Sequence, residues 1–504
     1  MTIHKLLDHH KRQVNRKAWS DLGQFSRELE ATGQLKPVTA PVLPRLQVTE
    51  LCHRSLVGNG PALLFENVRG HDMPVLGNLF GSEQRILAAL ELESRDQLYE
   101  LGKDLAFLRH PSLPDSMRST VEAIPGFARL AHVTPVRKDN APWNENVVEG
   151  PDVDLGTLPL STCWPEDAGP LITWGLVITR GPNKPRVNLA IYRQQKIGRN
   201  KLIMRWLEHR GGAQDFREFQ QADPGRPFPL AVVIGADPAT LLAAVTPIPD
   251  NLSEYQFAGL LRGRRSRVVE SGLSGLPIPH GAEIVLEGHI QPGETAIEGP
   301  FADHTGYYNS TAEFPVFTVE RISHRENPVY LTTYMGKPGE DEPSIMASTL
   351  NEMFIPMLQE HFPEVVDFYL PTEACSYRVA IVSIRKQYPG HARRIMFGIW
   401  SCLRQFTYTK TIIVTDDDID VRNWKEVIWA VSTRADPVRD TVLVDNTPID
   451  YLDFASPKPG LGGKMGIDAT NKLAAETSRS WGRVASMDHA TREQVEDIAR
   501  SLGL

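Results

Sequence analysis

The chain has 504 residues, more than one hydrophobic core usually holds, so the length predicts two or three domains. Apolar residues make up 41% of the sequence and charged residues 23%, which excludes a disordered or fibrous protein. The 54 basic and 62 acidic residues give a formal charge of -8 without a long block of one sign. The composition therefore gives no support to a nucleic-acid partner.

The four cysteines lie far apart and form no CxxC pair, which argues against a disulfide framework or a zinc ribbon and favours a cytoplasmic protein. They are Cys52, Cys163, Cys375 and Cys402. The longest apolar runs, Leu171 to Thr179 and Phe228 to Ala236, are about half the length that a bilayer requires. We therefore expect no membrane-spanning segment.

The first twenty residues are basic, and apolar residues recur from Leu7 to Phe25 at roughly helical spacing. A helix at a membrane surface explains this pattern, and so does a helix that docks onto the first domain. The following segment from Ser20 to Gly33 predicts a capped helix. Ser94 and Gln97 predict a capping box for a second helix that ends at His110-Pro111, so residues 1–125 are expected to form an α/β region.

Residues 126–335 have a different texture, with short strands rich in Val, Ile, Thr, Tyr and Trp between Gly/Pro turns, and this spacing predicts a β-barrel. The predicted strands lie in ITWGLVITR, RVNLAIYRQQ, NKLIMRWL, LAVVIGA, AEIVLEGHI and PVFTVERI. Two helices are expected, one capped by Asp237-Pro238 and one with a capping box of Ser253 and Gln256.

The stretch GKPGEDEP at 336–343 is the best linker candidate because it combines Gly, Pro and acids without periodicity. In residues 344–504, apolar strands in YRVAIVSI, KTIIVTD and TVLVDN alternate with helical segments, which predicts βαβ units and a parallel sheet. The expected fold class is thus mixed α/β in three parts.

Two segments resemble known binding motifs but do not match their spacing. GLGGKMG at 460–466 fails the Walker and dinucleotide spacings, so we expect a flexible turn there. The acids Asp416 to Asp418 and Asp420 lack the spacing of a calcium loop, and solvated acids at a strand end are the expected reading.

In VNLAIYRQQ the apolar residues Leu189 and Ile191 alternate along one face of a strand, and Arg193 is the next residue on that face. A buried guanidinium requires an anionic partner, which can be a side chain, a substrate carboxylate or a phosphate, although an Arg at a strand end can also reach solvent. Glu298 and Asp303 in EGPFADHTGYY lie in a Gly/Pro loop among aromatic residues. Such paired acids are suited to acid/base chemistry. A surface loop that carries acids without a catalytic role is the alternative.

Beyond these residues, long segments resemble the UbiD family of decarboxylases, and within it the branch that acts on 3-polyprenyl-4-hydroxybenzoate. The segments include NLAIYRQQKIGRNKLIMRWLEHRGGA, LSEYQFAGLLRG, EGPFADHTGYYN, DFYLPTEACSYRVAIV and GLGGKMGIDATNK, and the resemblance spans about residues 34–483. It implies an N-terminal α/β region, a central split β-barrel that binds flavin, and a C-terminal α/β domain used in oligomerisation.

The resemblance also implies prenylated FMN, made by a separate flavin prenyltransferase, together with a divalent metal, manganese or else magnesium, and a monovalent cation such as K⁺ beside it. The implied metal ligands are Asn188, His209 and Glu254, a hard donor set. The implied flavin contacts are Ile191, Tyr192, Arg193, Arg205, Trp206, Leu207, Arg210 and Gly211. Strict alternation places Asn188 and Arg193 on opposite faces of the strand, so a twist, bulge or strand end must lie between them.

The implied catalytic network is Arg193, Glu298 and Asp303, with Asp303 as the acid that protonates the ring carbon. We expect decarboxylation of 3-polyprenyl-4-hydroxybenzoate to a 2-polyprenylphenol in ubiquinone biosynthesis. A decarboxylase of a soluble phenolic acid shares this site, whereas a split-barrel flavin oxidoreductase or a flavin carrier needs no such network. We also expect a homo-oligomer, with a hexamer favoured, and a cytoplasmic protein that contacts the inner face of the cell membrane only at its surface.

Overall fold

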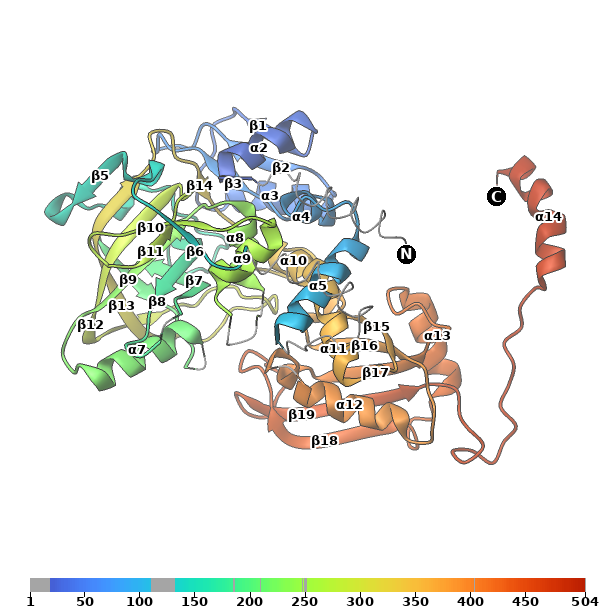
Figure 1. The fold of residues 1–504 in the computed structure, drawn as a ribbon. Coiled ribbons are helices and arrows are strands. Elements are labelled where there is room, and N and C mark those ends of the chain that lie inside the picture. Colours follow the sequence, from blue (N-terminus) through green and yellow to red (C-terminus); the bar gives the residue numbers. More distant parts are fainter. Residues whose placement is uncertain are drawn as a thin grey trace, which may run out of the picture.

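The computed structural model describes residues 19–503 apart from 110–131, 185, 209, 247, 249–251 and 403. Its mixed α/β architecture has the three expected parts, with a closed barrel beside an N-terminal α/β region and a C-terminal α/β domain (Figure 1). The predicted fold class is therefore confirmed.

The N-terminal region contains four helices and three short strands within the described residues. They are α2 (Leu22–Ala31), β1 (Leu35–Val38), α3 (Gln47–Val57), β2 (Ala62–Phe65), β3 (Val75–Gly77), α4 (Glu83–Ala89) and α5 (Arg95–Arg109). Strand β14 (Tyr330–Leu331), from the far end of the barrel segment, completes the sheet in the order β1-β2-β3-β14. The chain thus returns to the first region before it enters the third.

Helix α2 follows the sequence prediction closely. Asp21 caps it by accepting from the backbone N of Gln24, and Leu22 and Phe25 are buried, which favours the docking interpretation for this part of the N-terminal pattern. Gly33 follows the helix with φ of 72°, a left-handed conformation that suits glycine. The remaining basic residues of the pattern, in 1–18, lie outside the described residues.

Helix α5 ends at Arg109, as the sequence predicts, but its expected capping box is displaced by one residue. The side chain of Gln97 accepts from the backbone N of Glu93 at 2.7 Å, while the backbone N of Gln97 donates to the carbonyl of Ser94. The reach of the Gln side chain lets it bond the residue before the predicted cap.

The central barrel has six strands that close through the pairing of β12 with β13. In spatial order they are β12 (Ile284–Glu298), β9 (Phe228–Ile234), β6 (Leu171–Thr179), β7 (Asn188–Lys196), β8 (Lys201–Met204) and β13 (Ala312–His324), with β5 (Asn146–Glu149) added outside β13. All six barrel strands overlap predicted segments, although β12 extends beyond AEIVLEGHI to Glu298, which was expected in a loop. A small separate sheet contains β4 (Val136–Lys138), β10 (Arg267–Glu270) and β11 (Pro277–Pro279).

Three helices accompany the barrel: α7 (Gly211–Ala222), α8 (Pro238–Val245) and α9 (Glu254–Arg262). The predicted caps of α8 and α9 are confirmed, since Asp237 accepts from the backbone N of Thr240 and Ser253 with Gln256 forms a complete capping box. Helix α9 therefore begins directly at Glu254, one of the implied metal ligands.

The C-terminal domain has a five-stranded sheet in the order β15-β16-β17-β19-β18. Its elements are α10 (Glu342–Leu350), α11 (Ile355–His361), β15 (Val365–Tyr369), β16 (Val379–Ile384), α12 (His391–Cys402), β17 (Thr411–Asp416), α13 (Trp424–Arg434), β18 (Thr441–Pro448), β19 (Leu461–Ala469) and α14 (His489–Leu502). The predicted parallel pairing of YRVAIVSI with KTIIVTD is confirmed in β16 and β17, and β19 joins them in parallel, whereas the third predicted strand, TVLVDN in β18, pairs antiparallel at one edge, as β15 does at the other.

One sequence interpretation in this domain is wrong, and a second is wrong for one of its four residues. The segment GLGGKMG is not a flexible turn but lies largely in β19, because its backbone pairs with β17 on one side and β18 on the other. Gly466 permits this close packing, since a β-carbon there would lie 2.4 Å from the sulfur of Met396. Asp416 is not solvated but 9% exposed, and Arg434 neutralises both Asp416 and Asp418, whereas Asp417, Asp418 and Asp420 are exposed, as predicted.

The stretch 336–343 is folded rather than extended. Asp341 caps α10, and the buried Glu342 carboxylate accepts from the backbone N of Phe80 and from the Thr333 hydroxyl. These bonds join the start of the C-terminal segment to the N-terminal region.

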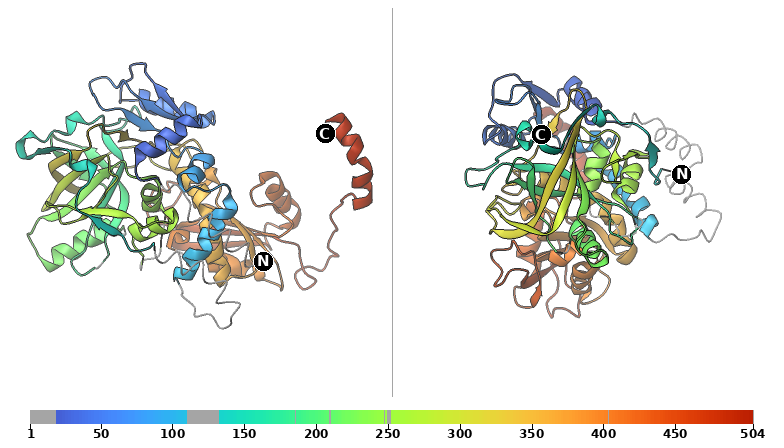
Figure 2. Two further views of the ribbon diagram at one scale, coloured as in Figure 1. Left: turned by 45° about the horizontal axis from the view of Figure 1, so that its top comes forward. Right: turned by 90° about the vertical axis from the view of Figure 1, so that its left-hand side faces the viewer.

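One hydrophobic core runs through the N-terminal region and the barrel, and two smaller clusters cover the faces of the C-terminal sheet. Helix α14 stands away from the rest of the molecule in two views (Figure 1; Figure 2, left) and buries none of its residues. Within the described part of the chain, no helix is both long and apolar enough to cross a membrane.

Candidate active site

Arg193 and the two predicted acids meet at one end of the barrel. Arg193 Nε donates to Glu298 Oε1 at 2.7 Å, and its Nη1 donates to Asp303 Oδ2 at 3.3 Å. The side chain of Arg193 is 12% exposed, that of Asp303 4% and that of Glu298 is fully buried. The guanidinium is therefore a buried cation with two anionic partners, and the interpretation of Arg193 as a solvent-exposed strand end is wrong.

The strand that carries Arg193 has one irregularity in its pairing with the neighbouring strand. The register between β6 and β7 shifts between Ile172 and Gly175, opposite the stretch from Tyr192 to Gln194. Such an irregularity re-aims side chains that strict alternation would place elsewhere. The pairing from Asn188 to Tyr192 is regular, so the extra residue lies on the partner strand β6 opposite Arg193 and not within β7 between Asn188 and Arg193.

The loop that carries Asp303 is fixed by side chains from two directions. Asn309 accepts from the backbone N of Phe301 at 2.8 Å, and Gln195 of β7 accepts from the backbone N of Gly299 at 3.0 Å. The ring of Phe301 lies beneath Arg193, with 4.7 Å from the guanidinium carbon to the ring centroid. The acids are thus held on a rigid support rather than on an exposed loop.

Arg205, which the sequence suggests only as a flavin contact, belongs to the same charge network. Its Nη1 donates to Asp303 Oδ2 at 3.0 Å, and its Nε lies 3.7 Å from Glu298 Oε2. Its Nη2 donates to the hydroxyl of Tyr451 from the C-terminal domain. Two arginines and two carboxylates therefore form a compact, nearly neutral cluster.

Asp303 is ionised in this arrangement. Burial alone would raise the pKa of Asp303, but the hydrogen bond from His304 and the charges of His304, Arg205 and Arg193 outweigh burial and hold that pKa well below its usual range. The assigned acid therefore requires a proton source within reach.

Sequence reasoning missed His304 and Asp450. His304 Nδ1 lies 2.9 Å from Asp303 Oδ1, and His304 Nε2 lies 3.0 Å from Asp450 Oδ2. The position of His304 directly after Asp303 was a usable signal. No local pattern could reveal Asp450, which lies 146 residues further along the chain.

Several polar atoms in this cluster have unused bonding capacity. Arg193 Nη2, Arg205 Nε and Glu298 Oε2 are buried and make no hydrogen bond within the described part of the chain. Buried donors of this kind normally have partners. The two guanidinium nitrogens are suited to an anionic ligand such as a carboxylate.

Two of the three implied metal ligands lie close together. Glu254 Oε2 accepts from the backbone N of Leu189, the residue next to Asn188, at 3.1 Å. Asn188 Nδ2 donates to Thr179 Oγ1 at 3.2 Å, which leaves its carbonyl oxygen directed toward Gly211. The third implied ligand, His209, lies outside the described residues.

The chemistry of this donor pair fits a hard cation. Burial raises the pKa of Glu254 to about 7, against the opposing effect of backbone hydrogen bonds, so the carboxylate lacks a sufficient cationic partner. A β-carbon on Gly211 would lie 2.2 Å from Asn188 Oδ1, so glycine is required beside the amide oxygen. No cluster of three or more His, Cys, Asp or Glu ligands occurs among the residues that the structure describes.

The implied flavin contacts occupy different environments. Tyr192 and Trp206 are buried and pack edge to face, and the Tyr192 hydroxyl accepts from the backbone N of Gly212 at 3.0 Å. Ile191, Arg205 and Leu207 are half-buried, whereas Arg210 is exposed at the N-cap of α7 and Gly211 is its first residue. The N-terminal end of this helix, where the helix dipole is positive, favours a phosphate.

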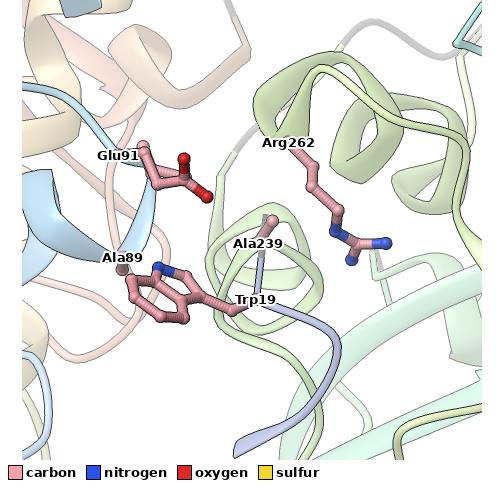
Figure 3. Close-up of a pocket in the computed structure, with 6 residues that line it drawn as sticks. Trp19, Ala89, Glu91, Ala239 and Arg262 are labelled. Carbon is pink, nitrogen blue, oxygen red and sulfur yellow. The ribbon is translucent and has the colours of Figure 1, made fainter. Parts of the chain in front are cut away.

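A small cavity lies elsewhere, between the N-terminal region and helices α8 and α9 (Figure 3). Its lining residues are Trp19, Ala89, Leu90, Glu91, Ala239 and Arg262. With a volume of about 10 Å³ it has room for no more than one water molecule. It is therefore not a candidate for substrate or cofactor.

The sequence matches three domains that carry one description, 3-octaprenyl-4-hydroxybenzoate carboxy-lyase. The N-terminal domain matches residues 26–105, the Rift-related domain 134–338 and the C-terminal domain 344–469. The Rift-related domain contains the whole Arg193, Glu298 and Asp303 network.

Solved structures of similar fold include the closed form of vanillic acid decarboxylase from Sedimentibacter hydroxybenzoicus, at 29% identity and TM-score 0.83, covering 97% of this chain and 100% of that one. The UbiD-class enzyme HmfF from Pelotomaculum thermopropionicum in complex with FMN has 28% identity and TM-score 0.78, with 94% and 99% coverage. An evolved dimeric form of HmfF in complex with prFMN has 27% identity and TM-score 0.77, with 95% and 100% coverage. This chain carries all three domains of the UbiD family and belongs to that family of carboxy-lyases.

Proposed function

We propose that this chain decarboxylates a 3-polyprenyl-4-hydroxybenzoate to a 2-polyprenylphenol, as a step of ubiquinone biosynthesis, with prenylated FMN and a divalent metal. The observation that carries the proposal is the buried cluster in which Arg193 binds both Glu298 and Asp303. The match to domains of 3-octaprenyl-4-hydroxybenzoate carboxy-lyase and the sequence resemblance support the choice of substrate.

The chain's own residues have distinct tasks in this reaction. Arg193 Nη2 and Arg205 Nε, the buried donors without a hydrogen bond among the described residues, receive the substrate carboxylate. Glu298 holds the Arg193 guanidinium in place by accepting from its Nε. Asp303 hands a proton to the ring carbon after carbon dioxide leaves.

Asn188, Glu254 and the predicted ligand His209 would hold Mn²⁺ or Mg²⁺ beside the cofactor phosphate, with K⁺ as a further cation. The start of α7, with Arg210 and Gly211, would bind the phosphate. Prenylated FMN supplies an electron sink for the pair left by decarboxylation. The cofactor comes from a flavin prenyltransferase, which is thus a functional partner.

A decarboxylase of a free phenolic acid is the second candidate. The observation in its favour is the similarity to a vanillic acid decarboxylase over nearly the whole of both chains. Both candidates use the same cluster, and they differ in whether a polyprenyl tail must be accommodated.

The test is co-expression with a flavin prenyltransferase, followed by cofactor mass, absorption spectrum and carbon dioxide release. The carboxylic acids tested as substrates are a prenylated 4-hydroxybenzoate, vanillate and protocatechuate. We expect prenylated FMN and highest kcat/KM on the prenylated acid. Preference for vanillate or protocatechuate would establish the second candidate, and NAD(P)H oxidation without carbon dioxide release would contradict both.

We also propose a homo-oligomer, with a hexamer favoured. Helix α14 supports this because Val495, Ile498 and Leu502 are 47%, 59% and 67% exposed on a helix that buries no residue. Light scattering is expected to give a multiple of the 56.3 kDa chain mass, and a monomer at micromolar concentration would contradict it.

A further inference from the structure

His304 connects the assigned acid to the C-terminal domain. Its two ring nitrogens face two different carboxylates, Asp303 at 2.9 Å and Asp450 at 3.0 Å. An imidazole donates from both nitrogens only when it carries two protons. The geometry therefore favours a protonated ring held between two anions.

The surrounding charges agree with this assignment. Burial lowers the pKa of His304, but the hydrogen bonds and charges of Asp303 and Asp450 raise it to about 9. The other charged or titratable groups that bear on this arrangement are Arg193 and Arg205 beyond Asp303, Tyr377 and Arg378 beyond Asp450, and Asp341. Near neutral pH the ring is a cation.

Asp450 is itself fixed in position. The Tyr377 hydroxyl donates to Asp450 Oδ2 at 3.1 Å, and Arg378 Nη2 lies 3.4 Å from the same oxygen. The backbone N of Leu452 donates to Asp450 Oδ1 at 3.0 Å. The imidazole is thus oriented by a rigid group from another domain.

Resting on the proposed decarboxylation, we infer that His304 is the positioning residue that stores the proton for Asp303, and that Asp450 holds its ring in place. Asp303 is ionised between Arg193 and Arg205, so it has no proton of its own to give. His304 touches Asp303 directly and is 21% exposed, so it can be recharged from solvent.

The relay balances. The bond from the ring carbon to the carboxylate breaks, carbon dioxide leaves, and the electron pair remains on the substrate side. The carbon then forms a C–H bond with a proton from Asp303, which receives one from His304 Nδ1. His304 recovers its proton from water, so the reaction consumes one proton and needs no oxidant or reductant.

The first experiment measures protonation directly. Histidine ¹⁵N NMR of the full-length protein, with the His304 signal assigned by its loss in His304→Gln, should give a titration midpoint near pH 9. Asp450→Asn should lower the midpoint by roughly one to three pH units, the usual effect of removing a neighbouring charge. A midpoint near 6.5, or one that Asp450→Asn leaves unchanged, would overturn the inference.

The second experiment measures proton delivery through exchange of the product's ring hydrogen in D₂O, together with kcat against pH. His304→Gln should slow exchange and turnover by about 10²-fold. Asp450→Asn should move the alkaline loss of kcat to lower pH, and it serves as the informative variant if His304→Gln does not fold.

His289→Gln is the matched control, because His289 also pairs with a carboxylate, Glu320 at 3.3 Å, and has a similar exposed fraction of 26%. It should leave exchange, kcat and the pH profile unchanged. Wild-type exchange and alkaline behaviour in His304→Gln would overturn the relay while leaving the decarboxylase assignment intact. If wild type decarboxylates no phenolic acid, the proposed function fails and the relay with it, whereas the NMR midpoint still reports the state of His304.

Discussion

Arg193 on β7 and Glu298 at the end of β12 lie 105 residues apart in sequence, yet Arg193 Nε donates to Glu298 Oε1 at 2.7 Å. Glu298 is fully buried and Arg193 nearly so, which makes this a desolvated ion pair at the end of the barrel. Removing one partner of such a pair leaves an uncompensated buried charge. The pair therefore has a structural role as well as the proposed chemical one.

Replacement of Arg193 by lysine tests the guanidinium geometry. Lysine keeps the charge but lacks the planar fork that holds Glu298 and Asp303 while presenting Nη2 to a carboxylate, so kcat/KM should fall by at least about 10²-fold. Steady-state kinetics on the best phenolic acid measure the change.

Arg262→Lys is the matched control for that variant, since the Arg262 side chain is 11% exposed and pairs with Asp237 away from the cluster. It should retain wild-type kcat/KM. Equal losses in both variants would mean that burial of any arginine near the barrel, rather than the site itself, explains the effect.

Asp303→Asn keeps the shape of the acid but removes its ability to transfer a proton. Turnover should fall by roughly 10²-fold or more, the usual contribution of general acid catalysis, while cofactor binding survives. Carbon dioxide release and flavin content measured on the same sample separate the two effects. Near-wild-type turnover with bound cofactor would assign the proton to Glu298 or to water instead.

Glu254→Ala tests the proposed metal site. Loss of this carboxylate should lower metal and flavin retention without unfolding the protein, and Glu254→Gln should do the same while preserving an acceptor for the backbone N of Leu189. Metal analysis, flavin absorbance and circular dichroism provide the readouts.

The control is Glu283→Gln, because Glu283 is likewise buried, accepts from a backbone N–H at Val329 and has its pKa raised by burial to about 7. Its metal and flavin content should match wild type. Unchanged metal and flavin in a folded Glu254→Ala protein would remove Glu254 from the ligand set.

Two helical glycines should respond oppositely to alanine. A β-carbon on Gly102 of α5 would lie 2.4 Å from the carbonyl oxygen of Met353, so Gly102→Ala should destabilise the fold by about 1–3 kcal/mol. At Gly23 of α2 the nearest atom lies at 3.4 Å, and Gly23→Ala should stabilise by about 0.5–1 kcal/mol. Denaturant unfolding gives both values, and a neutral Gly102→Ala would disprove the close packing of α5.

Local sequence patterns were sufficient to predict much of the fold. The barrel strands and the caps at Asp237 and Ser253 follow from periodicity and capping chemistry, because these effects act over a few residues. β19 was missed because its glycines are typical of turns, and the close packing of Gly466 against Met396, which favours glycine there, is visible only in the folded structure.

The candidate site likewise has a part that could be predicted from the sequence and a part that could not. A buried Arg193 requires an anion, and the acid-bearing segment around Glu298 and Asp303 is recognisable from the sequence, although Glu298 ends β12 rather than lying in the expected loop. The contacts of Arg205 with Tyr451 and of His304 with Asp450 depend on how the barrel meets the C-terminal domain. Contacts of that kind have no signature in a single sequence.

The most direct measurement of the central claim is release of labelled carbon dioxide from a carboxyl-labelled 3-polyprenyl-4-hydroxybenzoate, with wild type and Asp303→Asn at equal cofactor and metal content. Wild type should release carbon dioxide steadily, and the variant should release it about 10²-fold more slowly. Equal release by both proteins, or no release by a wild-type protein that carries prenylated FMN and metal, would contradict the central claim.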